Sequence, residues 1–245
     1  KGAAGTGKTT LIHFILDQIS SKGLTCSIMA PTGRAARVIG EKINIPASTI
    51  HKSIYRYENL KDLKIKSSHN NNDSSTYEYY FDLKYNDMNK KHIYLVDESS
   101  MLSNKFNDDE FIKFGSGYLL NDLIRFVDFN IPDNNRKIIF IGDYAQLPPV
   151  NMDSSPALDS NYLNKKFSSL KFSESILKEI VRQKSESLLL KNATHIRKQI
   201  DSKSYYNFSI QNNSTECIEA NTKDLIEKFI GSYKINSHNN SVLIT

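Results

Sequence analysis

The sequence is poor in the features that mark secreted, zinc-binding and membrane proteins. Its 245 residues include two cysteines, Cys26 and Cys217, and neither has a His or another Cys at ligand spacing. A disulfide scaffold and a zinc site are therefore not expected, and a reducing, intracellular compartment fits better. No apolar run approaches the roughly 18 residues of a membrane-spanning helix, and nothing resembles a signal peptide, so we expect no membrane partner.

Composition and charge are those of an ordinary globular protein with one basic half. The chain is 39% hydrophobic and 24% charged, and it is long enough for one large or two small domains. Residues 1–96 hold 14 Lys and Arg against 8 Asp and Glu, whereas the remainder sums to −1. A basic half suits a polyanionic partner, although charge runs more often belong to solvated faces.

Short apolar runs alternate with helical patterns along most of the chain. Buried parallel strands are predicted at residues 24–30, 93–96 and 137–141, because each run ends in a polar, Pro or Gly signal. Helices are predicted at residues 9–20, 118–129 and 222–233, together with a short one capped by Ser48. Strands that alternate with helices predict an α/β fold with a parallel sheet.

One segment breaks this rhythm. Residues 57–66 and 76–85 tend towards strand, and the second of them alternates aromatic or apolar with polar side chains. A polar run, residues 67–75, joins them. The pattern predicts an inserted β-hairpin with a long tip.

The first residues match the phosphate-binding pattern G-x-x-x-x-G-K-S/T, and an apolar helix follows at once. The glycines let backbone N–H groups wrap phosphates at the positive end of that helix. Lys8 is expected to reach the β- and γ-phosphates, and the Thr9 hydroxyl to bind Mg²⁺. A plain Gly-rich turn is the alternative. We therefore expect ATP and Mg²⁺ as cofactors, with the nucleotide bound by Gly2, Ala3, Ala4, Gly5, Thr6, Gly7, Lys8, Thr9 and Thr10.

Two of the predicted strands deliver carboxylates at their carboxyl ends, where ligands bind in open α/β sheets. Asp97 is expected to hold magnesium through water, and Glu98 to act as general base, a role worth about 10²–10⁴-fold. Asp143 likewise follows the carboxyl end of a predicted strand, residues 137–141. Gln146 can accept from water and donate to a γ-phosphate. Alone, each carboxylate could be a loop residue; the phosphate loop makes the set specific.

Five segments occur in a characteristic order: the phosphate loop, Ala30-Pro31-Thr32-Gly33-Arg34-Ala35-Ala36, Thr49-Ile50-His51, Asp97-Glu98-Ser99-Ser100-Met101 and Gly142-Asp143-x-x-Gln146-Leu147-Pro148-Pro149-Val150. Through this ordered set the chain resembles the superfamily 1B DNA helicases of the RecD-like and Dda-like group. The resemblance covers roughly residues 1–56 and 92–183 and implies a RecA-like P-loop NTPase fold.

The resemblance also implies roles for particular residues. Single-stranded DNA would be contacted by Thr32, Gly33, Arg34, Thr49 and His51. Gln146 would link the γ-phosphate to the grip on DNA. Arg182, in a segment similar to the family's fourth motif, would be an arginine finger, a contact worth about 10³–10⁵ in rate. Local alternatives stay open: His51 bonded to a nearby carbonyl, Arg34 paired with Glu41, and Arg182 as a solvated charge.

The expected domain plan follows the same resemblance. Residues 1–56 and 92–183 would form the RecA-like ATPase domain, residues 57–91 a pin hairpin, and residues 184–245 the start of a second RecA-like domain. Lys1 is not a Met and abuts a loop that a buried strand normally enters, and residues 241–245 resemble the start of a strand. We therefore expect a fragment of a longer protein.

The expected activity is ATP-driven movement along single-stranded DNA, with 5′-to-3′ polarity implied by the resemblance, and unwinding of forked duplex DNA. An RNA helicase and a non-catalytic ATP-binding switch remain as alternatives. The expected location is the cytoplasm or nucleoid, or the nucleus or an organelle of a eukaryote. The sequence leaves the oligomeric state open.

Overall fold

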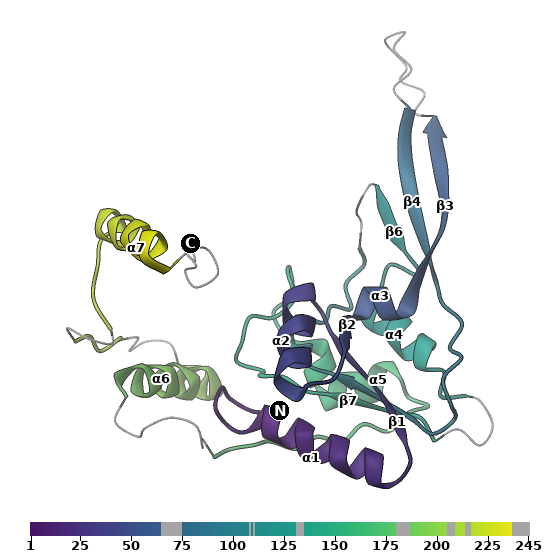
Figure 1. The fold of residues 1–245 in the computed structure, drawn as a ribbon, viewed down its shortest axis with the longest axis horizontal. Helices are drawn as coiled ribbons and strands as arrows, with labels where there is room; N and C mark the ends of the chain where they lie inside the picture. Colours follow the sequence, from purple (N-terminus) through teal and green to yellow (C-terminus); the bar gives the residue numbers. More distant parts are fainter. Residues whose placement is uncertain are drawn as a thin grey trace. The chain divides into compact units, whose positions relative to one another are not determined.

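The computed structural model describes residues 1–64, 75–107, 109, 111–130, 135–179, 187–204, 209–213 and 217–236. The chain forms two compact units, Lys1–Arg182 and Gln183–Thr245, and each is described by itself. Figure 1 traces the elements along the chain.

The first unit is built on a four-stranded parallel sheet in the order β2-β1-β5-β7. Its strands are β1 (Thr25–Ala30), β2 (Ala47–Thr49), β5 (His92–Val96) and β7 (Lys137–Phe140). The three apolar runs predicted as strands are β1, β5 and β7, which confirms that prediction. All carboxyl ends of these strands lie at one edge of the sheet, as parallel pairing requires.

The phosphate loop begins next to the carboxyl end of β7. The Gly2 amide donates to the Gly142 carbonyl at 3.1 Å, and the Leu177 amide donates to the Lys1 carbonyl at 2.7 Å. Gly2 and Leu177 form a parallel bridge. Residues 1 and 2 thus lie between the end of β7 and residue 177, which places the loop at the carboxyl edge.

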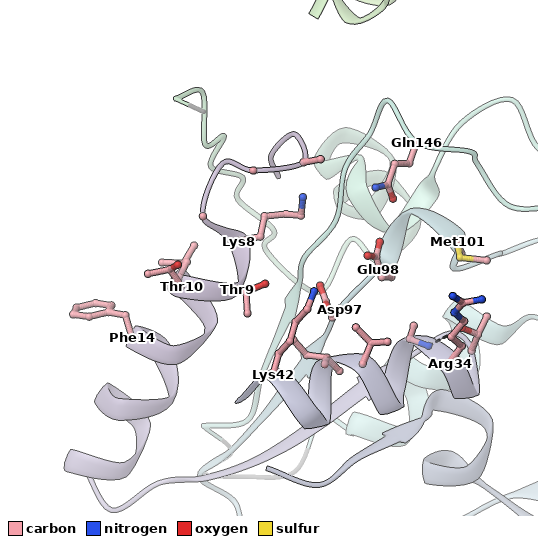
Figure 2. A pocket seen from close by; sticks show the side chains of 18 residues that line it. Lys8, Thr9, Thr10, Phe14, Arg34, Lys42, Asp97, Glu98, Met101 and Gln146 are labelled. Atoms are coloured by element: carbon pink, nitrogen blue, oxygen red, sulfur yellow. Dashed lines mark hydrogen bonds between the residues drawn. The ribbon is translucent and has the colours of Figure 1, made fainter. Parts of the chain in front are cut away.

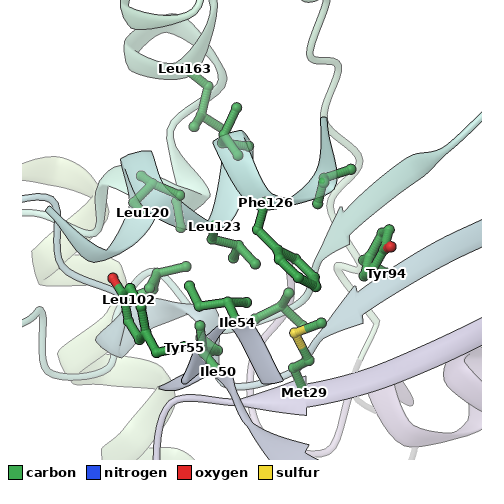
Figure 3. Packing of buried hydrophobic residues seen from close by; sticks show 14 residues of the cluster. Met29, Ile50, Ile54, Tyr55, Tyr94, Leu102, Leu120, Leu123, Phe126 and Leu163 are labelled. Carbon is green, nitrogen blue, oxygen red and sulfur yellow. The ribbon is translucent and has the colours of Figure 1, made fainter. Parts of the chain in front are cut away.

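Helices cover both faces of the sheet. They are α1 (Lys8–Ser21), α2 (Gly33–Ile43), α3 (Ile50–Ile54), α4 (Leu119–Val127) and α5 (Ser160–Lys166). Successive side chains of a strand point to opposite faces, so β1 and β5 supply two cores. Ile28 and Leu95 pack with residues of α1 and α2, whereas Met29, Tyr94 and Val96 pack with α3 and α4. Figure 3 shows the second cluster. Each fully buried aliphatic side chain contributes about 1.5–3 kcal/mol.

The cap of α3 corrects one prediction. Thr49, rather than Ser48, precedes the helix, and its Oγ1 accepts from the Lys52 amide at 3.1 Å. Ser48 lies in β2. The helix begins one residue later than the sequence suggested. Because a capping oxygen has to reach the amide three residues on, Thr49 caps the helix instead of Ser48.

The predicted hairpin is present. β3 (Tyr55–Lys64) pairs antiparallel with β4 (Ser75–Leu83), with a register shift between Tyr57 and Asn59. The predicted tip, apart from Ser75, lies outside the described residues. A third strand, β6 (Ile112–Phe114), pairs parallel with β4 and was not predicted. Its three residues, Ile-Lys-Phe, are too short a run to predict a strand, so only the tertiary pairing defines it.

A buried carboxylate ties the hairpin sheet to α4. Asp122 is fully buried and accepts from the Tyr55 hydroxyl at 2.8 Å, the Ser116 amide at 2.8 Å and the Ser116 hydroxyl at 2.6 Å. Burial, and then the hydrogen bond to Asp122, raise the pKa of Tyr55, so its hydroxyl stays a donor. Three donors satisfy the carboxylate in a site that excludes water.

The second unit contains α6 (Leu188–Ser202) and α7 (Thr222–Asn236). The helix predicted at residues 222–233 is α7, three residues longer; α6 was not predicted, because its segment is rich in polar residues. The strand predicted at residues 241–245 lies outside the described residues. In the described part of the chain, no helix is both long and apolar enough to cross a bilayer.

We predict that Asp122→Ala lowers the free energy of unfolding by about 2–4 kcal/mol, because it leaves the buried Tyr55 hydroxyl and two partly buried Ser116 donors without an acceptor. Urea unfolding of the chain measures this value. Asp87→Ala removes an exposed carboxylate and is the control, with an expected change below about 0.5 kcal/mol. Adding Tyr55→Phe to Asp122→Ala should cost less than the sum of the single changes; an additive result would contradict the network.

Candidate functional site

The phosphate loop owes its shape to its glycines. Gly5 and Gly7 have φ of 79° and 84°, in the left-handed region that favours glycine. A Cβ on Gly2 would lie 2.5 Å from the Thr6 hydroxyl oxygen and 3.0 Å from the Leu177 Cβ. The Thr6 hydroxyl donates to the Ala3 carbonyl at 2.8 Å. These contacts hold the loop against the sheet and direct it into α1.

Lys8, the first residue of α1, lies over this loop. Its ammonium donates to the carbonyls of Gly2 and Ala3, each at 2.9 Å. Gly7, the N-cap, provides no side-chain bond to the first helical amides. Those amides and the Lys8 ammonium form the donor set that a phosphate group prefers at a helix N-terminus.

Asp97 and Glu98 stand at the carboxyl end of β5. The Asp97 amide donates to the Met29 carbonyl of β1 at 2.9 Å. Burial raises the pKa of Asp97, and burial together with Asp97 raises the pKa of Glu98, while Lys8 opposes both shifts. Glu98 has φ of 51°, the left-handed region that costs a non-glycine residue energy. Raised carboxyl pKa values and backbone strain both gather at functional sites.

The turn after β7 brings in a further carboxylate and an amide. Asp143 is 2% exposed, and its Oδ1 accepts from the Ala145 amide at 3.1 Å. The Gln146 amide donates to the Asp143 carbonyl at 3.1 Å, which fixes the position of Gln146 after the turn. Asp143 therefore lies below the surface, and Gln146 is the residue that reaches the open side.

These elements surround one cavity of about 930 Å³, shown in Figure 2. Among the residues predicted for ATP, those that line it are Ala4, Gly5, Gly7, Lys8, Thr9, Thr10, Asp97, Glu98 and Gln146. Gly2, Ala3, Thr6 and Asp143 are not part of the lining; they support it from beneath. The Thr9 hydroxyl and the Asp97 carboxylate are hard oxygen donors, which suit a Mg²⁺ ion that keeps several waters.

The residues predicted to contact DNA fall into two groups. Thr32 caps α2 by accepting from the Ala35 amide at 3.2 Å, Gly33 is the first residue of that helix, and Arg34 follows. Thr32 and Arg34 line the same cavity as Lys8. The alternative pairing of Arg34 with Glu41 is wrong: Glu41 pairs with Arg37 at 2.8 Å.

The second group lies at α3. The Thr49 hydroxyl is engaged in the helix cap, as described above. The His51 ring packs edge-on against Phe114, with centroids 4.9 Å apart, and lies 5.7 Å from the Tyr55 ring. Burial lowers the pKa of His51, so the ring is neutral at pH 7. A neutral imidazole can hydrogen-bond to a phosphate but cannot attract it as a cation.

The cavity wall also includes residues that sequence reasoning did not assign to the site, among them Phe14 on α1, Lys42 on α2 and Met101 after β5. Lys42 could have been found, because Arg34, Val38 and Lys42 are spaced four residues apart and share one face of α2. Arg182 lies outside the described residues, and its role stays a prediction.

Sequence comparisons find one matching domain family and similarity to two proteins. The AAA domain family matches residues 1–112. An uncharacterized protein of Methanocaldococcus jannaschii is 36% identical over 174 residues, covering 67% of this chain and 12% of that protein. The ATP-dependent RecD2 DNA helicase of Deinococcus radiodurans is 29% identical over 151 residues, covering 61% of this chain and 16% of that protein. The chain thus spans less than a fifth of the length of either relative.

Among solved structures, Bacteroides sp Pif1 in complex with ADP-AlF4 is 20% identical with a TM-score of 0.43, over 94% of this chain and 44% of that chain. This likeness is too weak to bear on fold or function.

The parallel sheet, the phosphate loop and the carboxylates at the strand ends define a P-loop NTPase. Within that class, the ordered motifs resemble those of the RecD-like helicases of superfamily 1B, and the RecD2 helicase is among the proteins to which the chain is similar.

We predict that Glu98→Asn raises the free energy of unfolding by about 0.5–1 kcal/mol, because Asn tolerates the left-handed region. Glu98→Ala removes the charge but keeps the strain, and it should stabilise less. Urea unfolding measures both, and equal effects would contradict a contribution from backbone strain. The folded-state pKa of Glu98 is raised, so its stabilising contribution is lost as pH rises through that pKa. Both gains should therefore be larger at pH 7 than at pH 4.

Proposed function

We propose that this chain is the ATP-hydrolysing core of a DNA helicase that works inside the cell. The observation that carries the proposal is that one and the same cavity is lined by Lys8, Thr9, Asp97, Glu98 and Gln146. Each of these side chains has a distinct task in phosphoryl transfer to water. Similarity to the Deinococcus relative, an ATP-dependent DNA helicase, supports the same activity.

The residues divide the chemistry among them. Backbone amides at the start of α1 and the Lys8 ammonium bind the β- and γ-phosphates. Thr9 and Asp97 would hold a Mg²⁺ ion, which would supply positive charge next to the phosphates. Glu98 takes the proton of the attacking water, and its raised pKa brings its basicity closer to the operating pH. Gln146 orients that water against the γ-phosphate. Arg182 acts as the arginine finger.

Motion along DNA would use the starts of two helices, α2 at the cavity and α3. Thr32, Gly33 and Arg34 at α2, and Thr49 and His51 at α3, hold the phosphate backbone of single-stranded DNA. Residues 184–245 begin a second motor domain, which closes on ATP and opens after hydrolysis. The proposed polarity is 5′-to-3′, and the proposed substrate is a forked duplex.

The hairpin sheet is the proposed pin. Cross-strand pairing puts Tyr57 and Phe81 on one face, and β6 adds Phe114, which stacks on Phe81 with centroids 4.8 Å apart. On the same face, Tyr57 and Tyr79 are 55% and 46% exposed. Separating a base pair costs about 1.4 kcal/mol of stacking per step. Stacking of an unpaired base on an aromatic side chain stabilises it by about 1–3 kcal/mol. The exposed part of this face can therefore receive an unpaired base.

We predict that Glu98→Gln lowers the DNA-stimulated ATPase of the intact protein by about 10²–10⁴-fold, because the general base is lost. Oligo-dT and oligo-U should be compared as activators, since stronger stimulation by oligo-U would favour an RNA helicase. The 245-residue variant chain should still bind ATP, whereas Lys8→Ala should not. An unchanged ATPase in Glu98→Gln would leave only an ATP-binding switch.

We predict that Tyr57→Ala with Tyr79→Ala slows unwinding of a forked duplex by the intact protein by about fivefold or more, since two stacking surfaces are removed. ATPase activity on single-stranded DNA should change little. Tyr80→Ala on the opposite face is the matched control, because the Tyr80 hydroxyl donates to Glu78 at 2.6 Å within its own strand. Equal slowing by Tyr80→Ala would exclude a specific stacking face.

A further inference from the structure

Lys42 lines the nucleotide cavity from the wall opposite the phosphate loop. It belongs to the last turn of α2 (Gly33–Ile43) and shares the face of that helix that carries Arg34 and Val38. Figure 2 shows the Lys42 side chain directed towards Asp97, while Lys8 enters the cavity from α1. The cavity therefore has a lysine on each of two facing helices.

The Lys42 ammonium differs from the other cations near it. The Lys8 ammonium is held by two backbone carbonyls, and Arg37 pairs with Glu41 on the exposed side of α2. Among the residues that the structure describes, Lys42 makes no ion pair within 4.0 Å. Burial raises the pKa of Asp97 and of Glu98, and the charge of Lys42 acts against both shifts. The Lys42 charge thus acts on the two carboxyls of the cavity without forming an ion pair with either of them.

An ammonium in this position suits an anionic ligand. The charged side chains of the lining are Lys8, Arg34, Lys42, Asp97 and Glu98, so the cavity carries a small positive excess. A lysine is a flexible point charge with three donors, and it can follow a phosphate group without fixed geometry. A nucleotide triphosphate held at the loop would present its terminal phosphates between the two lysines.

We propose that Lys42 is a second cationic contact for the polyphosphate of the bound nucleotide. The inference rests on the proposed function, since it takes the cavity to be the ATP site. Lys8 neutralises the phosphates from the loop side, and Lys42 neutralises them from α2. The contact requires the terminal phosphates, so it discriminates ATP from AMP.

The test is the affinity of the 245-residue chain for ATP with Mg²⁺ and for AMP, measured by titration calorimetry. Lys42→Ala is expected to weaken ATP binding by about tenfold. This is the loss expected when one charge-assisted contact, weakened by solvent screening, is removed. AMP binding should change by less than about twofold, because the contacted phosphates are missing. Lys42→Arg keeps the charge and should stay within about threefold of the wild type for ATP.

Lys91→Ala is the matched control. Lys91 is exposed just before β5, at the opposite edge of the sheet from the cavity, and its loss changes the net charge equally. The proposal is overturned if Lys42→Ala binds ATP as tightly as Lys91→Ala, or if Lys42→Ala weakens ATP and AMP equally. If the wild-type chain does not bind ATP, or Lys8→Ala binds it unchanged, the proposed function itself fails.

Discussion

Three loops of the site meet at Gly142, and the geometry of the cavity depends on how closely they approach there. The Gly142 carbonyl accepts from the Gly2 amide, which anchors the phosphate loop. A Cβ on Gly142 would lie 3.1 Å from the Ser100 amide nitrogen and 3.0 Å from a Leu158 methyl carbon. A Cβ would therefore require the Leu158 side chain or the turn after Glu98 to shift by a few tenths of an ångström. The absence of a side chain therefore lets the turn after Glu98 lie close to the Asp143 turn.

The hairpin sheet is joined to the same framework through aromatic rings and one carboxylate. Phe114 contacts the rings of His51, Tyr55 and Phe81, with centroids between 4.8 and 5.2 Å apart. Asp122 fixes the Tyr55 hydroxyl from α4. Because packed aromatic clusters deform little, the hairpin base and the α3 segment form one rigid part.

Periodicity and motif spacing predicted much of this molecule. The strands β1, β5 and β7 were visible as apolar runs because both faces of a parallel sheet are buried. The strands of the hairpin were visible through their alternation. In contrast, β6 and α6 carry too weak a pattern of their own, and Ser48 and Thr49 are equally good capping residues by type. Lys42 escaped notice because a lysine on a surface helix is ordinary until a cavity is found beside it.

The sequence by itself determined the class of chemistry, since the order Lys8, Asp97, Glu98, Gln146 and the glycines of the loop specify a phosphate site whatever surrounds them. The tertiary structure decided which other groups share that site. It joined Arg34 and Lys42 to the cavity, buried Asp143 beneath it, and left His51 neutral. These outcomes depend on burial and on distances between segments far apart in the chain, which motif spacing does not encode.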